Sequence, residues 1–132
     1  MVRLERKMKH TLKVSEDGSF FTIITEGEGD VEGIIAFLKD IISHPQWKPG
    51  NLILLDHRAL KIDEITVSGI EDVSAYFKTI SNELGNGKVA LLMKREIDFG
   101  IARAWENITE YDVDIKVYVF RELEKAISWL KE

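Results

Sequence analysis

The apolar run Leu52–Leu55 constrains the fold of this chain more than any other feature of its sequence. It follows the turn signal Pro49-Gly50 and shows no polar alternation. A continuous apolar run of this kind is typical of a strand that is covered on both faces or lies deep in a parallel sheet. We therefore expect a central parallel strand here, with the other elements arranged around it.

The beginning of the chain predicts a β-hairpin. Residues 10–14 alternate between polar and apolar side chains, and residues 20–25 are rich in β-branched and aromatic ones. Asp17-Gly18 lies between these segments, and glycine accepts the positive φ that tight hairpin turns need. We expect this hairpin to contribute one antiparallel strand at an edge of the sheet.

Strands and amphipathic helices alternate through the rest of the chain. The predicted helices cover residues 31–43, with Asp30 as the N-cap, and residues 68–84, 98–111 and 123–130. The further predicted strands cover residues 52–55, 89–93 and 115–120. The order β-β-α-β-α-β-α-β-α predicts a single α/β domain over residues 1–132, with a mixed, mostly parallel sheet.

The composition excludes several classes of protein. Hydrophobic residues make up 45% of the 132 residues, too many for a disordered chain, and no apolar run is long enough to span a bilayer. The chain has no Cys, which excludes disulfides, thiolate zinc sites and cysteine nucleophiles. A net charge of −5 argues against a dedicated nucleic-acid binder. Because the N-terminus lacks the apolar segment of a signal peptide, we expect a cytoplasmic protein.

We expect neither a cofactor nor a metal ion. The three histidines, His10, His44 and His57, are far apart and show no ligand spacing. The N-terminal arm is basic and could touch an acidic membrane surface or nucleic acid, since it carries Arg3, Arg6, Lys7, Lys9 and Lys13 against Glu5. We interpret it instead as a solvated terminus that leads into an edge strand, where lysine deters aggregation.

Four segments of the sequence resemble a known family. They are the strand ending Leu54-Leu55-Asp56-His57-Arg58, then Lys88-Val89-Ala90-Leu91-Leu92, then Phe99-Gly100-Ile101-Ala102-Arg103, and the closing segment from Val119 to Leu130. These segments and the order of elements resemble the STAS fold of anti-sigma-factor antagonists. The second half is similar to small bacterial and archaeal STAS-like proteins that are grouped with CRAL-TRIO lipid-transfer domains. The resemblance implies a STAS-like domain with a regulatory, protein-binding role, or a domain that binds a lipid-like ligand.

Ser68 has two interpretations. The resemblance implies a phosphorylation site, because anti-sigma-factor antagonists carry a phosphorylatable serine at the start of the helix after the central strand. Val67-Ser68-Gly69 has a similar place here, although no acidic residue precedes it and the connection from Asp56 is longer. The alternative is a plain N-cap, since Ser68 and Glu71 match a capping box.

Charged side chains follow three of the predicted strands. The residues concerned are Asp56, His57 and Arg58 after the first of these strands, Arg95 after the next and Arg121 after the last. Ligands of open α/β sheets bind beyond the carboxyl ends of the strands, so these side chains could hold a phosphate or carboxylate. The alternative is that the arginines cap carbonyl groups or pair with Asp56 and other nearby acids.

The sequence does not predict a catalytic site. A triad of Ser68, His57 and an acid is conceivable from composition, but adjacent strand residues such as Asp56 and His57 point in opposite directions. The chain also lacks the Gly-x-Ser-x-Gly elbow that would help to build an oxyanion hole.

Aromatic residues near the third helix suggest a surface. Phe99 and Trp105 could line an apolar groove or a homodimer interface, or they could be ordinary core. The sequence thus predicts a non-catalytic interaction or regulatory module, with Ser68 as a candidate switch. The alternative function is binding of a small-molecule or lipid-like ligand in an apolar pocket with Arg58, Arg95 or Arg121 at its mouth.

Overall fold

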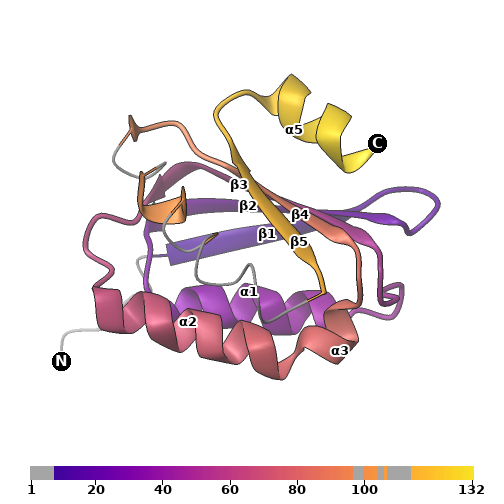
Figure 1. Ribbon diagram of the computed structural model, residues 1–132, viewed down its shortest axis with the longest axis horizontal. Coiled ribbons are helices and arrows are strands. Elements are labelled where there is room, and N and C mark those ends of the chain that lie inside the picture. Colours follow the sequence, from indigo (N-terminus) through magenta and orange to yellow (C-terminus); the bar gives the residue numbers. More distant parts are fainter. Residues whose placement is uncertain (1–7, 97–99, 104–105, 107–113) are drawn as a thin grey trace, which may run out of the picture.

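The computed structural model describes residues 8–96, 100–103, 106 and 114–132, and its strands form one mixed sheet (Figure 1). The strands are β1 (Met8–Val14), β2 (Phe20–Glu28), β3 (Leu52–Lys61), β4 (Lys88–Leu92) and β5 (Lys116–Phe120), and they lie in the order β1-β2-β3-β4-β5. β1 pairs antiparallel with β2, and all later neighbours pair in parallel. The predicted mixed sheet with an antiparallel strand at its edge is therefore confirmed.

The hairpin turn between β1 and β2 is held by one carboxylate. Gly18 has a φ of 77°, the left-handed conformation that the Asp-Gly pair predicts. The Asp17 carboxylate accepts hydrogen bonds from the backbone N–H of Ser19 at 3.0 Å, the Ser15 hydroxyl at 2.7 Å and the Ser19 hydroxyl at 2.7 Å. The backbone N–H of Ser19 and then these hydroxyls lower the pKa of Asp17 to about 2.

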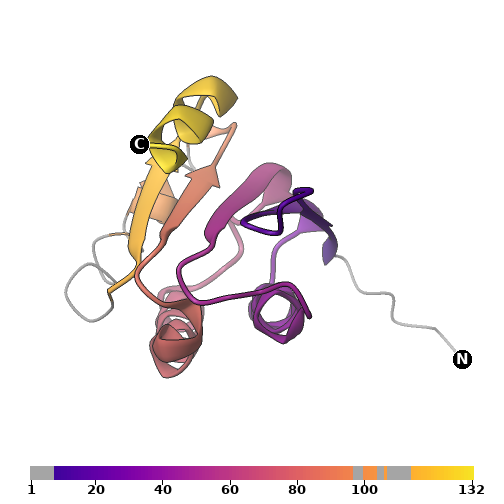
Figure 2. The ribbon, with the colours of Figure 1, turned by 90° about the vertical axis from the view of Figure 1, so that its right-hand side faces the viewer.

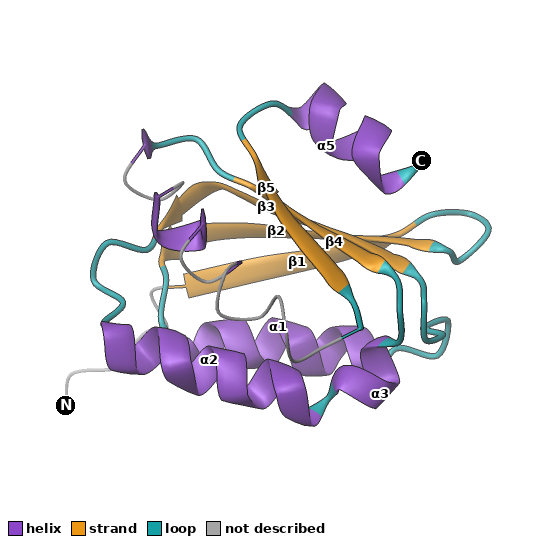
Figure 3. Ribbon diagram, viewed as in Figure 1, coloured by secondary structure: helices purple, strands orange, loops and turns teal. Residues whose placement is uncertain are grey.

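Helices cover both faces of the sheet (Figures 2 and 3). α1 (Val31–Ser43), α2 (Val67–Thr79) and the short α3 (Ser81–Leu84) lie on one face, and α5 (Leu123–Leu130) lies on the other. Because the parallel strands follow one another in a single direction, right-handed crossovers place their helices on the same face. The helix predicted up to Leu84 is divided at Ile80, and of the helix predicted over 98–111 the described residues 100–103 are helical.

Two apolar clusters explain the unbroken run Leu52–Leu55. Ile53 and Leu55 point into the larger cluster, between the sheet and α1 and α2. Leu54 points the other way, into the smaller cluster under α5. A strand with apolar contacts on both faces cannot show polar alternation, so the predicted central strand is confirmed.

β3 is longer than the sequence predicts. The pairing of β3 with β4 ends at Asp56, opposite Leu92, but β3 continues beside β2 as far as Lys61. The register between β2 and β3 shifts after Ile24, so that β3 carries one extra residue there. Asp56, His57 and Arg58 therefore lie within a strand, and not beyond its end. Pairing with the long β2 extends β3 to Lys61. The sequence around Asp56 gives no sign of this pairing, because β2 lies far away in the chain.

One backbone donor at the free edge of β5 is occupied by a side chain. The backbone N–H of Val119 donates to the Glu106 carboxylate at 2.9 Å, and Arg103 lies 3.5 Å from the other oxygen of that carboxylate. The bond occupies an edge donor that could otherwise pair with a strand of another chain. Among the described helices, none is both long and apolar enough to cross a membrane.

Candidate functional site

The N-terminal end of α2 differs from the sequence-based prediction. Thr66 is the N-cap of this helix, and its Oγ1 accepts a hydrogen bond from the backbone N–H of Gly69 at 3.0 Å. Ser68 already lies in the first helical turn, so the predicted capping box of Ser68 with Glu71 is wrong. Both Thr66 and Ser68 are suitable cap residues by type. The extended backbone of Thr66 (φ −76°, ψ 166°) decides between them.

Ser68 has no capping role, and its residue is exposed. Its neighbour Val67 is 72% exposed, which makes it the most exposed large apolar side chain among the described residues. Gly69 lets the start of α2 pack closely against its neighbours. A Cβ at this position would lie 3.1 Å from Val31 of α1 and 3.2 Å from Ile65. Gly69 is therefore buried against α1 and the β3–α2 connection, while Val67 and Ser68 are exposed.

Arg58 and Asp56 form a paired unit on β3. The guanidinium donates to the carboxylate through two bonds, Nε to Oδ1 at 2.9 Å and Nη2 to Oδ2 at 2.8 Å. Burial by itself raises the pKa of Asp56, but the bonds and the charge of Arg58 outweigh it, so the pKa lies below its usual value. Alternation along β3 places Asp56 on the α5 face, with Leu54.

Arg95 pairs with a different acid. Its Nη2 lies 2.6 Å from Oδ1 of Asp63, in the connection between β3 and α2. The side-chain bond from Arg95 is the main reason that the pKa of Asp63 is lowered. Arg121 is exposed and follows β5. Two of the three candidate anion-binding arginines thus contact separate carboxylates in this structure, and their role in binding an anion stays a prediction.

His57 lies on the opposite face of β3 from Asp56. Its ring is buried, with 5% of the residue exposed, and Nδ1 lies 2.6 Å from the Oγ1 of Thr25, which is fully buried. The Thr25 hydroxyl also lies 3.2 Å from the backbone carbonyl of Asp56, to which it can donate its proton. The ring centroid of Phe37 is 5.7 Å from that of His57. This arrangement holds the imidazole in a fixed orientation, while Ser68 lies exposed on the surface of α2.

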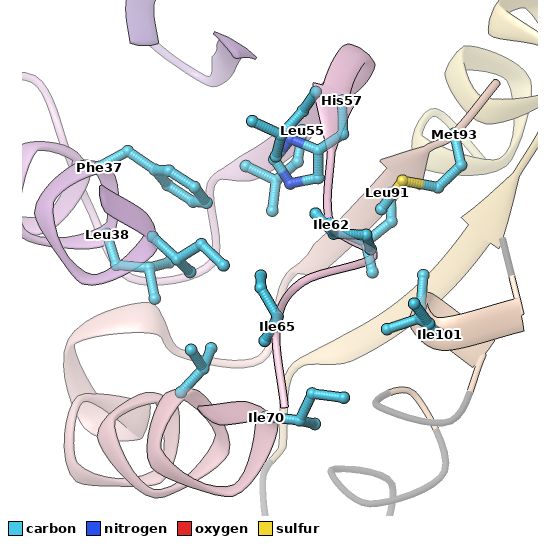
Figure 4. Close-up of a pocket in the computed structure, with 14 residues that line it drawn as sticks. Phe37, Leu38, Leu55, His57, Ile62, Ile65, Ile70, Leu91, Met93 and Ile101 are labelled. Atoms are coloured by element: carbon cyan, nitrogen blue, oxygen red, sulfur yellow. The ribbon is translucent and has the colours of Figure 1, made fainter. Parts of the chain in front are cut away.

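An apolar cavity lies beside His57, between the sheet and the helices α1 and α2 (Figure 4). Its volume is about 70 Å³. The described residues that line it are Ile34, Phe37, Leu38, Leu55, His57, Leu60, Ile62, Ile65, Ile70, Val73, Leu91, Met93, Ile101 and Ala102. Among these, His57 is the one polar side chain.

The sequence did not locate this cavity. It predicted an apolar groove or interface at Phe99 and Trp105, which lie outside the described residues. Of the arginines predicted at the mouth of a pocket, Arg58 pairs with Asp56 on the α5 face of β3, and none of the three is among the described residues that line this cavity. A possible signal was the apolar spacing of Ile62 and Ile65 in the connection after β3, which a solvated loop does not need. In the part of the chain that the structure describes, no group of three or more acids and histidines could hold a metal ion.

The sheet order, the edge hairpin and the helices on both faces define a SpoIIAA-like fold, the fold of STAS domains. One similar solved structure is an uncharacterized protein of the DUF3478 family with a SpoIIAA-like fold from Shewanella loihica PV-4. It matches with a TM-score of 0.60 and 16% identity over 98% of each chain. The chain is also similar to an anti-sigma factor antagonist from Mycobacterium paratuberculosis, with a TM-score of 0.51 and 14% identity over 95% of each chain. The predicted resemblance in fold is therefore confirmed. Comparison with models of protein families and with curated proteins gives no match.

Proposed function

We propose that this domain is a non-catalytic cytoplasmic regulatory module that binds another protein through the N-terminal end of α2, and that phosphorylation of Ser68 controls the binding. The observation that carries the proposal is that Ser68 is an exposed residue in the first turn of a helix that Thr66 already caps. The Ser68 hydroxyl is thus available for modification without loss of the cap. The fold of an anti-sigma factor antagonist supports a regulatory role.

Phosphorylation at Ser68 would change the surface without unfolding the helix. A phosphate adds about −1.5 to −2 charge and three acceptor oxygens. The unpaired backbone N–H groups of the first turn and the helix dipole favour an anion at this position. Glu71 and Asp72 lie three and four residues further along the same helix and are both exposed. The phosphate would therefore concentrate negative charge on one side of α2.

Val67 supplies the apolar part of the proposed contact. An exposed valine in the first turn of a helix adds little to the stability of the folded domain, but a partner could bury its side chain. A phosphate on the adjacent residue would have to be desolvated when such a contact forms, which opposes binding. Modification of Ser68 is thus expected to release the partner.

The test compares variants of the purified domain as bait in lysate of the source cells, with captured proteins quantified by mass spectrometry. A specific partner is expected to bind the wild type and Ser68→Ala equally and to be lost with Ser68→Asp and with Val67→Asp. Ser128→Asp, at an exposed serine of α5, is the matched control and should retain the partner.

Phosphopeptide mapping of the domain isolated from its own cells provides the second measurement. A phosphorylated fraction at Ser68 is expected. The proposed switch is refuted if Ser68 is never modified and Ser68→Asp captures the same proteins as the wild type. If Val67→Asp also leaves capture unchanged, the docking surface lies elsewhere.

A further inference from the structure

We propose that the cavity between the sheet and α1 and α2 is a binding site for a small apolar ligand, namely a short alkyl group or the end of a longer alkyl chain. The site is separate from the surface of Val67 and Ser68, and the proposal does not depend on binding of a protein there. It rests on the shape, volume and chemistry of the residues that line the cavity.

The walls of the cavity come from elements far apart in the sequence. Leu55 and His57 of β3 and Leu91 of β4 form the side of the sheet, and Phe37 of α1 and Val73 of α2 face them. Figure 4 shows these elements arranged around an open space, with Leu38, Ile62 and Ile65 pointing toward it. Protein interiors are packed with few voids larger than a water molecule, so an open space of this size in a small domain is unusual.

The exposure of the lining residues shows where the cavity opens. Its deeper residues, such as Phe37, Leu55 and Leu91, are buried. Four lining isoleucines are only half-buried, and they come from α1, from the β3–α2 connection, from α2 and from residues 100–103: Ile34, Ile65, Ile70 and Ile101. These half-buried isoleucines favour an apolar group where the cavity meets the surface.

The volume and polarity of the cavity favour hydrocarbon over water. At about 70 Å³ the cavity is several times larger than the roughly 10–15 Å³ that holds a single water molecule. A buried water needs two or more polar partners, and His57 is the one polar side chain among the described lining residues. An alkyl group of a few carbon atoms would contact mostly apolar side chains, and it has no polar atom that needs a hydrogen-bond partner.

His57 sets a limit on the ligand. Thr25 fixes the ring through the 2.6 Å bond to Nδ1, and Phe37 packs against it, so the imidazole forms a rigid wall. A rigid wall and a small volume together select slender groups over bulky or aromatic ones.

The test is a titration of the purified domain with hexanol, followed through the isoleucine methyl signals in NMR. Saturable shifts of Ile62 and Ile65 are expected, and hexanediol, which has a hydroxyl at each end, should bind more weakly. Ala102→Leu adds bulk inside the cavity and should weaken hexanol binding on the order of tenfold or more. Ala75→Leu, at an exposed position of α2, is the matched control and should bind like the wild type.

Two results would overturn the proposal. One is methyl shifts that rise linearly with hexanol up to its solubility limit. The other is unchanged saturable binding in Ala102→Leu. If Ala102→Leu does not fold, Val73→Leu adds bulk from α2 and the same comparison applies. Because the titration uses the isolated domain, a negative result leaves the test of Ser68 unaffected.

Discussion

The assignment of the α2 cap makes a prediction that separates Thr66 from Ser68. Thr66→Ala removes the side-chain acceptor of the 3.0 Å bond from the N–H of Gly69 and leaves that donor without a partner from the helix. Loss of an N-cap typically costs about 0.5–2 kcal/mol. Because Thr66 is exposed and water can replace part of the bond, we expect about 1 kcal/mol.

Ser68→Ala is expected to have almost no effect on stability. Ser68 lies inside the first turn, and alanine is a better helix former than serine, so the change should be neutral or slightly stabilising, by a few tenths of a kcal/mol. Asp30→Ala is the calibration, because the carboxylate of Asp30 caps α1 through a 2.6 Å bond to the N–H of Gly33. This variant should lose at least as much stability as Thr66→Ala.

Urea unfolding followed by circular dichroism measures these differences. The dependence of the unfolding free energy on urea should be the same for all variants, so that shifts of the midpoint report stability. Thermal midpoints should fall by roughly 3–5 °C for Thr66→Ala in a domain of this size. The reasoning is refuted if Ser68→Ala loses about 1 kcal/mol and Thr66→Ala loses nothing. That result would restore Ser68 as the cap and remove the main support for its role as a switch.

Two further predictions concern glycine conformation and acid stability. Gly85→Ala should destabilise the domain by more than about 1 kcal/mol, because Gly85 has a φ of 78° and an added Cβ would lie 2.6 Å from the backbone nitrogen of Gly50. Gly100→Ala, in a helical segment where an added Cβ meets nothing within 4 Å, should be neutral or stabilising in the same unfolding assay, and equal losses for both variants would contradict the argument. The carboxyl of Asp17 should titrate near a pKa of about 2 in NMR, below its ordinary value of 3.8, and Ser15→Ala should raise that pKa by removing one hydrogen bond. Since the pKa is depressed in the folded state, the stabilisation from Asp17 is present above pH 3.8 and is lost as the pH falls toward 2, and an ordinary pKa in the folded protein would disprove the hydrogen-bonded turn.

The sequence determined the order and type of most elements, because these depend on local patterns. The Leu52–Leu55 run predicted a strand with apolar contacts on both faces, and Asp17-Gly18 predicted the hairpin turn. Asp30 predicted where the first helix begins. In each case the signal lies within a few residues, where periodicity, caps and backbone freedom act directly.

The tertiary structure decided what depends on partners distant in the chain. The pairing of β3 with the long β2 carried the strand past Asp56, and the path of the β3–α2 connection made Thr66 the cap in place of Ser68. Likewise, Arg95 pairs with Asp63, which is 32 residues away in the sequence. The cavity lies where strands, helices and the segment around Ile65 meet. A sequence shows which side chains can pair or pack, but the fold determines the distances between them, and the proposed sites depend on those distances.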